Sequence, residues 1–389
     1  MNAFLHIAKR EVRILFSYKT NFIFTIILPF ISMLFFNTLL QEGVPRDLPI
    51  AVVDFDQSAL SRNLIFLLDA TPELKVRYAP LNQNEGEALV RTGDIYGLIT
   101  IPNHFEKDLK QGKQTKVINQ FNGNLLLPGG LEDKAFKQVV GTLSAGVNIQ
   151  KQLKNGVLME QAKANFQPVS ANNHVLSNPF TNYSYYLNSG FLAMFFQIFV
   201  ILTTIYSFGT DFKYRKGQKL YNIGNSNVFV ILTAKVFPYT LWFFFVGLLM
   251  YFSMFVLQDF PLFGNKLALL AGLLLLIISS QAFAVFFISI SNSLRQALTL
   301  GSGFAATSLS FSGITFPIFG MPAPMQWLSQ LFPFTHFFEL FLDQTQRGIP
   351  VFYSFYAIAA LVILSILPML AGWSKLKKLL LKGEFLHRI

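Results

Sequence analysis

Side chains that could do chemistry are few in this sequence, and only one group has a spacing that brings them together. His336, Glu339 and Asp343 stand at positions i, i+3 and i+7, so they share one face if the segment is helical. Such a group could hold a metal ion or exchange protons. A solvated polar face of a helix explains the same spacing more simply, and it is the favoured interpretation. The other histidines are scattered, and the chain has no Cys.

Signatures of nucleotide hydrolysis are also absent. The sequence has no Gly-x4-Gly-Lys-Ser/Thr loop to bind phosphates, and neither Gly-x-Ser-x-Gly nor His-Glu-x-x-His occurs. We therefore expect no catalytic residue, cofactor or metal on this chain. If ATP drives its work, ATP and Mg²⁺ are expected on a separate chain.

The composition indicates a protein surrounded by lipid. Only 13% of the residues are charged and 52% are hydrophobic, whereas soluble domains carry about 25% charged residues. A helix needs roughly 20 apolar residues to cross a bilayer. The apolar runs predict an α-helical integral membrane protein with six transmembrane helices, at Phe22–Leu40, Leu187–Phe208, Val228–Leu257, Leu267–Ile290, Ala297–Ile318 and Phe352–Trp373.

The distribution of Lys and Arg predicts the orientation. The excess that gives the net charge of +11 lies near the termini and in the connections after the second and fourth spans. Because Lys and Arg accumulate on the cytoplasmic side, both termini are expected there, and nucleic acid is not needed to explain the charge. The expected layout is an interfacial cytoplasmic helix (1–20), a first transmembrane helix (21–40), an outer domain (41–186), five transmembrane helices (187–373) and a basic cytoplasmic tail (374–389).

The polar segment after the first span has the pattern of an α/β domain. Ile50–Asp56 is typical of a buried strand, and Ser58–Ala70 has Leu at helical spacing. Asn82 and Asn103, each with Glu three residues later, are expected to cap helices. Further strands are expected at Leu74–Tyr78, Ile95–Ile101 and Thr115–Phe121, and a long return helix at Leu131–Phe166.

Two segments on the cytoplasmic side have the pattern of short helices. Phe4–Tyr18 has apolar residues at helical spacing with cations between them, which is typical of an interfacial helix. The loop 209–227 is expected to hold a short helix capped by Thr210 or Asp211, placed to receive a push from a soluble protein. Both segments can also be read as simple basic flanks that set the orientation.

Residues 313–345 are too apolar for a solvated loop and too rich in Pro for one span. Non-helical backbone at membrane depth must be buried in protein or line a cavity. The segment therefore predicts a re-entrant or interfacial helical hairpin. A hairpin that only anchors the last span is the alternative.

The second and fifth spans carry unusual residues. The fifth is rich in small and hydroxyl residues, with Gly301 and Ala305, and Gly303 and Thr307, at small-x3-small spacing. Such residues let helices approach closely, either between two subunits, along a substrate route, or within one subunit. The second span contains the amides Asn188 and Gln197, which rarely face lipid. No charged residue falls clearly inside a span, which argues against a proton-driven carrier.

Four stretches together resemble the permeases of the type-2 ATP-binding-cassette transporter family, in the bacterial subgroup with a large periplasmic domain between the first and second spans. Ile50–Arg62 is similar to the family's opening strand and D-x-S-x-x-S-R helix start. Gly97–Leu109 resembles its Ile-Pro-x-x-Phe-x-x-x-Leu unit. The others are the loop Asp211–Lys219 and the hairpin, from Ser312–Pro317 through Met321 and Pro322 to Leu331–Pro333.

The resemblance implies a complex of two permease subunits, either a homodimer or a heterodimer, with a cytoplasmic ATPase dimer. The residues that would contact or position the ATPase are Asp211, Lys213, Arg215, Lys216, Gly217, Arg10 and Arg13. The residues that would line the route or the dimer interface are Asn188, Met194, Phe195, Gln197, Phe199, Ser302, Thr307, Ser308 and Phe311. Pro317, Met321, Pro322 and Pro333 would shape the re-entrant hairpin. The loop departs from the family pattern Glu-Arg/Lys-Glu-x-Gly-Thr, because the second acid and the Thr are missing here.

We therefore expect a permease of the bacterial inner membrane that exports an amphipathic, hydrophobic or lipid-like substrate, such as a drug, lipid or metabolite. Its outer domain would receive the substrate or a periplasmic adaptor leading to an outer-membrane channel. Two other classes stay open: a membrane enzyme with a site near His336, Glu339 and Asp343, and an assembly anchor without transport.

Overall fold

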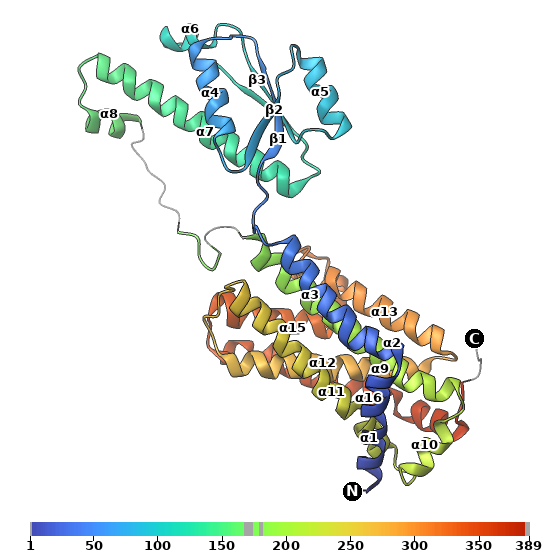
Figure 1. Cartoon of the computed structure of the whole chain (residues 1–389). Helices are drawn as coiled ribbons and strands as arrows, with labels where there is room; N and C mark the ends of the chain where they lie inside the picture. The colour runs from blue at the N-terminus through green and yellow to red at the C-terminus, as the bar shows by residue number, and fades with distance from the viewer. Residues whose placement is uncertain (1, 167–173, 179–181, 386–389) are drawn as a thin grey trace. The chain divides into compact units, whose positions relative to one another are not determined.

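The computed structural model describes residues 2–166, 174–178 and 182–385. The chain divides into two compact units (Figure 1): a helical unit formed by residues 1–43 and 175–389, and an inserted domain formed by residues 44–174. His387 and Arg388 of the expected basic tail, together with residues 167–173 and 179–181 of the expected outer segment, lie outside the described residues.

The helical unit begins with α1 (Asn2–Ser17), followed by a continuous helical stretch made of α2 (Lys19–Phe22), η1 (Ile23–Ile27) and α3 (Leu28–Leu39). After the inserted domain it continues with η2 (Ser184–Asn188), α9 (Ser189–Lys213), α10 (Gly217–Ile223), α11 (Val228–Phe252), η3 (Ser253–Leu257), α12 (Lys266–Ile290), α13 (Leu294–Phe311), η4 (Ile318–Gly320), α14 (Ala323–Ser329), α15 (Pro333–Leu342), η5 (Asp343–Arg347), η6 (Val351–Ser354) and α16 (Phe355–Lys382).

Several helices start where a polar side chain can satisfy their free amide groups. Asn227 caps α11, Asn265 caps α12 and Ser293 caps α13. The expectation that Thr210 or Asp211 would cap the short helix of the loop is wrong. Helix α9 runs on through both residues to Lys213, and α10 begins after Lys216 without a side-chain cap.

Within the described residues, five helices are long and apolar enough to cross a membrane: Lys19–Leu39, Ser184–Lys213, Val228–Leu257, Lys266–Ile290 and Val351–Lys382. The fifth expected span, Ala297–Ile318, corresponds to α13. This helix does not meet the measure because hydroxyl residues, Arg295 and Gln296 lower its hydropathy. It packs against α9. The last helix, α16, continues past residue 374, where a separate tail was expected to begin.

The hairpin segment is helical but broken. Helices α14 and α15 are separated at Gln330–Phe332, and Pro322 and Pro333 stand at their starts. Helix α15 is almost entirely buried against α12 and α16, whereas most of α14 is exposed.

The inserted domain has the α/β architecture expected from the sequence. Its sheet has the order β2 (Leu74–Tyr78), β1 (Leu48–Asp54), β3 (Gly97–Ile101) and β4 (Ile118–Phe121); the first three strands are parallel and β4 is antiparallel. Its helices are α4 (Ala59–Asp69), α5 (Gln83–Thr92), α6 (Phe105–Lys110), α7 (Leu126–Lys154) and α8 (Met159–Phe166).

Alternation along β1 builds the core of this domain on both faces of the sheet. Ile50 and Val52 pack with residues of α4 and α7, and Ala51 and Val53 pack with residues of α5. Asn82 caps α5 as expected. Asn103 does not cap α6, whose capping position is His104 in a left-handed conformation, because Asp56 accepts the bond from the Glu106 amide instead.

Candidate functional site: a buried ion cluster beside a basic groove

Four charged side chains meet between α1, α9 and α11. The Lys235 ammonium, on α11, lies 2.9 Å from Glu11 Oε1 and 2.8 Å from Asp211 Oδ2. Arg10, next to Glu11 on α1, lies 3.1 Å from Glu11 Oε1 and donates to both carboxylate oxygens of Asp211 on α9. Two cations and two anions therefore form one closed network, which we call the ion cluster.

The ion cluster is buried. The side chains of Lys235 and Glu11 are 0% exposed, and that of Asp211 is 5% exposed. Ser207 and Tyr239 donate to the second oxygen of Glu11, and the Lys235 ammonium stands 5.1 Å above the Phe208 ring. Ions out of water are tolerated only when paired and hydrogen-bonded, and the neutral sum of this cluster meets that condition.

Arg10 is the member of the ion cluster that reaches the surface, with its side chain 26% exposed. Burial opposes its charge, but the hydrogen bond and charge of Asp211 outweigh this and raise the pKa of Arg10 above its ordinary value. It stays a cation at any physiological pH, so the ion cluster permanently ties α1 to the ends of two long helices.

The sequence analysis missed two members of the ion cluster. Glu11 and Lys235 were treated only as charges that set the orientation. The statement that no charge falls inside a span is wrong for Lys235, because α11 begins at Val228 and places it two turns into a candidate span. A signal was present: Glu11 lies on the same face of α1 as the buried Ile7 and Leu15. An acidic residue on the apolar face of one helix and a single Lys within another apolar helix together predict a buried ion pair.

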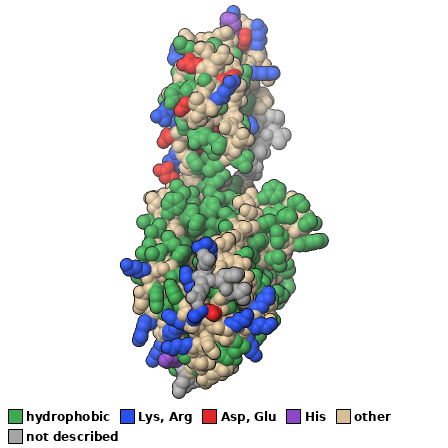
Figure 2. Space-filling model, turned by 90° about the vertical axis from the view of Figure 1, so that its right-hand side faces the viewer, with side chains coloured by type: hydrophobic (Ala, Val, Ile, Leu, Met, Phe, Trp, Pro, Cys, Tyr) green, Lys and Arg blue, Asp and Glu red, His purple; other side chains and the backbone are tan. Residues whose placement is uncertain are grey.

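A groove lined by residues of α1 and α10 opens beside the ion cluster. Figure 1 shows these two helices at the same end of the helical unit. The volume of the groove is about 880 Å³. Ile14, Leu220 and Ile223 form apolar parts of the wall, and none of the lining residues is acidic. The cations that line it are Lys9, Arg10, Arg13, Lys216 and Lys219. We call it the basic groove. Figure 2 shows Lys and Arg side chains gathered at one end of the helical unit, next to a surface rich in hydrophobic side chains.

The short helix α10 is held against the end of α16. The Gly217 amide donates to the Gly383 carbonyl at 3.2 Å, and a Cβ on Gly217 would come within 2.9 Å of the Gly383 Cα. Arg215 pairs with Glu384 at 2.5 Å. Any larger residue at position 217 would therefore push α10 away from its support.

The residues expected to couple to an ATPase separate into two groups in the structure. Lys213, Arg215 and Lys216 are exposed around α10, and Arg13 lines the basic groove. Asp211 is buried in the ion cluster and Gly217 is buried at the contact with Gly383, so in this conformation both act as supports.

The expected route residues of the second span point mostly into the helical unit. Asn188 is 0% exposed and donates to Asn37 at 3.0 Å and to Gln258 at 2.6 Å. Met194 and Phe199 lie in the core, and Phe195 packs against Phe36 at its edge.

Gln197, also on α9, is fully buried, and neither polar atom of its amide has a hydrogen bond within the described residues. An unpaired buried amide costs a few kcal/mol. A water molecule or a rearranged state of the helices is expected to satisfy it.

The two small-x3-small pairs of α13 face opposite ways. Gly301 and Ala305 are buried, and a Cβ on Gly301 would collide with Ile205 and Ile201 of α9. Gly303 has no neighbour within 4 Å of an added Cβ, and Thr307 is exposed. The first pair therefore packs inside the subunit, and the second pair is left without a partner among the described residues.

The other expected residues of α13 are partly or fully covered. Ser308 is buried and bonds to the Ala305 carbonyl, and Ser302 lines a cavity of about 480 Å³ beside Leu202 of α9. The ring of Phe311 stacks on Phe332 at 5.4 Å, which joins α13 to the hairpin. Within the hairpin, Pro317 precedes η4, and Met321 ends it.

His336, Glu339 and Asp343 do not form a site. His336 is buried with its ring nitrogen 3.0 Å from the Gln330 carbonyl, Asp343 pairs with Arg347, and Glu339 is exposed. No group of three or more His, Cys, Asp or Glu that could hold a metal is found within the described residues.

A comparison with protein families matches the family described as ABC-2 family transporter protein over residues 19–374. A search of curated proteins gives no match. The match covers the inserted domain, the first four candidate spans and most of the fifth, Val351–Lys382. With its long apolar helices, the chain is an integral membrane protein, and it belongs to the ABC-2 transporter family, whose members are the membrane components of transport systems.

Proposed function

We propose that this chain is the permease subunit of an ATP-binding-cassette exporter, and that a separate ATPase docks in the basic groove. The observation that carries the proposal is the ion cluster, which joins the wall of this groove to two long helices. A force applied to α1 would pass through the ion cluster into α9 and α11. ATP and Mg²⁺ bind the partner, and this chain needs no cofactor of its own.

The charge of the basic groove supports a protein partner with an acidic surface. Five cations line it without one acidic residue, and its apolar wall leaves room for hydrophobic anchors. Opposite potentials speed the encounter of two proteins and fix how they dock. Lys213 and Arg215 are exposed in the connection between α9 and α10 and add positive charge to this part of the chain.

Two copies, or this chain and a related permease, are proposed to pair through α13. Its exposed face carries Thr299, Gly303, Thr307 and Ser310, which are small or hydroxylated. Lipid offers such a face no partner, whereas a second helix can approach it closely and accept its hydrogen bonds. The route for substrate is proposed to lie along this face and the neighbouring α9, and rearrangement of α9 would give Gln197 its missing partner.

The cargo is proposed to be amphipathic, hydrophobic or lipid-like, such as a drug, lipid or metabolite. Phenylalanine rings pack between α3 and α9, where Phe36 stacks on Phe191 at 5.5 Å and lies 5.3 Å from Phe195. These rings favour apolar cargo over a small ion. The proposed setting is the bacterial inner membrane, with both termini and the basic groove in the cytoplasm and the inserted domain in the periplasm. Lys and Arg gathered around the groove support this orientation. A periplasmic adaptor with an outer-membrane channel is a further proposed partner.

The proposal is tested by purifying the tagged chain from its native membranes under mild extraction. An ATPase of the cassette type is expected to co-purify. The variant Lys216→Ala with Lys219→Ala should lose it, because both cations line the basic groove. The matched control, Lys377→Ala with Lys378→Ala, removes the same charge from exposed positions of α16 and should retain it. If no ATPase appears with the unchanged chain, the exporter assignment fails, and an assembly anchor becomes the better account.

A further inference from the structure

Glu132, near the start of α7, is a fully buried acid of the inserted domain, and no cation pairs with it within the described residues. Its Oε2 accepts a hydrogen bond of 3.0 Å from the side-chain amide of Asn119 on β4. On β3, a Cβ at Gly97 would come within 2.6 Å of Glu132 Oε1, so the carboxyl occupies the space that a larger residue at position 97 would need. The carboxyl of Glu132 therefore joins α7 to two neighbouring strands.

The pair formed by Glu132 and Asn119 lacks a donor. Glu132 Oε1 and Asn119 Oδ1 are both buried, and neither has a hydrogen-bond partner within the described residues. An ionised carboxyl only accepts hydrogen bonds, so an ionised Glu132 leaves both atoms unsatisfied, whereas a protonated carboxyl has one O–H donor. A proton on Oε1 that is donated to Asn119 Oδ1 satisfies both atoms at once. With the bond from Asn119 to Oε2, it closes a ring of two hydrogen bonds between an acid and an amide.

The charged groups around Glu132 do not stabilise its ionised form. Burial raises the pKa of Glu132 from 4.5 to about 7; the hydrogen bond from Asn119 opposes this rise, and the like charge of Asp133 adds to it. Strands β3 and β4 carry no titratable side chain. The other titratable groups nearby are Tyr96 before β3, Arg62 and Asp69 on α4, and Lys134 and Lys137 on α7. Arg62, Asp69 and Lys137 are bonded elsewhere, to Gln57, Lys75 and Asp133.

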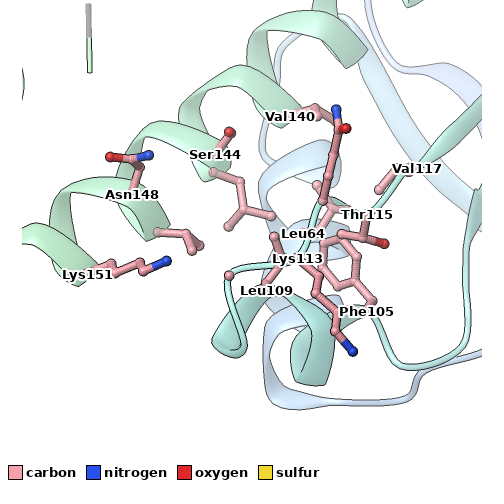
Figure 3. A pocket seen from close by; sticks show the side chains of 14 residues that line it. Leu64, Phe105, Leu109, Lys113, Thr115, Val117, Val140, Ser144, Asn148 and Lys151 are labelled. Atoms are coloured by element: carbon pink, nitrogen blue, oxygen red, sulfur yellow. The ribbon is translucent and has the colours of Figure 1, made fainter. Parts of the chain in front are cut away.

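Helix α7 is attached to the sheet over only part of its length. Its buried residues all lie between Gly129 and Val139, and Glu132 is the polar one among them. Figure 3 shows the part of α7 that follows, where Ser144 and Asn148 border a cavity of about 280 Å³ instead of a packed core. Both of these residues are exposed. A change at Glu132 therefore acts on the short stretch by which a long helix is held.

We propose that Glu132 is an un-ionised carboxylic acid paired with the amide of Asn119, and that loss of its proton loosens α7 from β3 and β4. Ionisation removes the O–H donor, leaves a charge out of water and sets two acceptor oxygens against each other. The contact is therefore a pH-operated latch of the inserted domain. The inference does not rest on the proposed function, because no residue of the helical unit takes part.

The test measures amide hydrogen exchange of the full chain in detergent by mass spectrometry between pH 5 and pH 8. Free peptides of the same sequence correct for the direct effect of pH on exchange. The opening constant of segment 118–136 should rise roughly fivefold or more for each pH unit between 5 and 7 and level off above pH 7, because opening releases the proton of Glu132. Peptides of α12, in the helical unit, should show no such rise and serve as the reference.

Three variants of similar size separate the latch from other effects of pH. Glu132→Gln keeps a donor for Asn119 at every pH, so segment 118–136 should stay protected and lose its pH dependence. Glu132→Gln with Asn119→Asp exchanges the acid and the amide, and it should restore the pH dependence. Glu160→Gln removes an exposed acid from α8 of the same domain and should behave as the unchanged chain does.

Infrared difference spectra between pH 5 and pH 8 read the proton directly. The unchanged chain should lose a carboxylic acid carbonyl band that is missing from Glu132→Gln. The unchanged chain alone can refute the proposal, whether or not the variants fold: equal opening of segment 118–136 at pH 5 and pH 8 overturns it. It is also overturned if Glu132→Gln keeps the pH dependence, if the exchanged pair does not restore it, or if Glu160→Gln abolishes it.

Discussion

Replacing Lys235 by Met leaves the ion cluster with two carboxylates and one cation. Because Lys235 and Glu11 are 0% exposed, the uncompensated charge stays out of water, and breaking such a pair costs about 3–5 kcal/mol of unfolding free energy. Glu11→Gln leaves the opposite imbalance and should cost about the same. The double variant restores neutrality with two uncharged residues.

The double variant is therefore expected to cost about as much as one single variant. The interaction energy of the cycle is then about 3 kcal/mol, far above the value of about 0.5 kcal/mol at which two sites count as independent. Lys213→Met removes an exposed cation from the end of α9 and should change stability by no more than about 0.5 kcal/mol.

Unfolding of the purified variants by dodecyl sulfate in mixed micelles, followed by tryptophan fluorescence, supplies the four free energies. All three Trp residues belong to the helical unit, so the signal reports this unit alone. If the effects of Lys235→Met and Glu11→Gln add without interaction, the two groups are not paired in the membrane protein and the reasoning is refuted.

Three further predictions follow from single residues. Burial raises the pKa of Glu132 from an ordinary 4.5 to about 7, so the stability of the inserted domain should be highest below pH 4.5, fall by about 3 kcal/mol between pH 4.5 and 7, and level off above pH 7. Pulse proteolysis in urea should show the fall, and Glu132→Gln should abolish it. Gly301→Leu should destabilise the single subunit, whereas Gly303→Leu should change only its self-association, as measured by light scattering. Asn188→Leu, which removes the hydrogen bonds from Asn188 to the half-buried Asn37 and Gln258, should cost about 1–3 kcal/mol in the same dodecyl sulfate assay, and an unchanged midpoint would contradict the observed bonds.

Features that depend on local pattern could be predicted from the sequence. The long apolar runs located the helices that meet the span measure, and alternation around Ile50 located the central strand β1. The cap at Asn82 followed from its spacing to Glu85. Each of these rests on interactions within a few residues, or on the apolar character of one segment.

The ion cluster depends on contacts between distant segments. Glu11 and Asp211 are joined through Lys235, and the three residues lie on three different helices. Their pairing therefore could not be predicted from the residues around any one of them. The same limit applies to Gly301 and Gly303. Both have the spacing of a packing motif, and only the position of α9 decides which of them is covered.

The central claim, that a partner ATPase docks in the basic groove, is tested most directly by cross-linking. The chain has no Cys, so Lys219→Cys places a single thiol in this groove, and Lys377→Cys places one on an exposed part of α16 as a control. A short thiol-to-amine reagent applied to native membranes should join the first variant, but not the second, to a protein that carries a phosphate-binding loop. Cross-links from both positions in equal amount, or none to such a protein from the groove, would contradict the account.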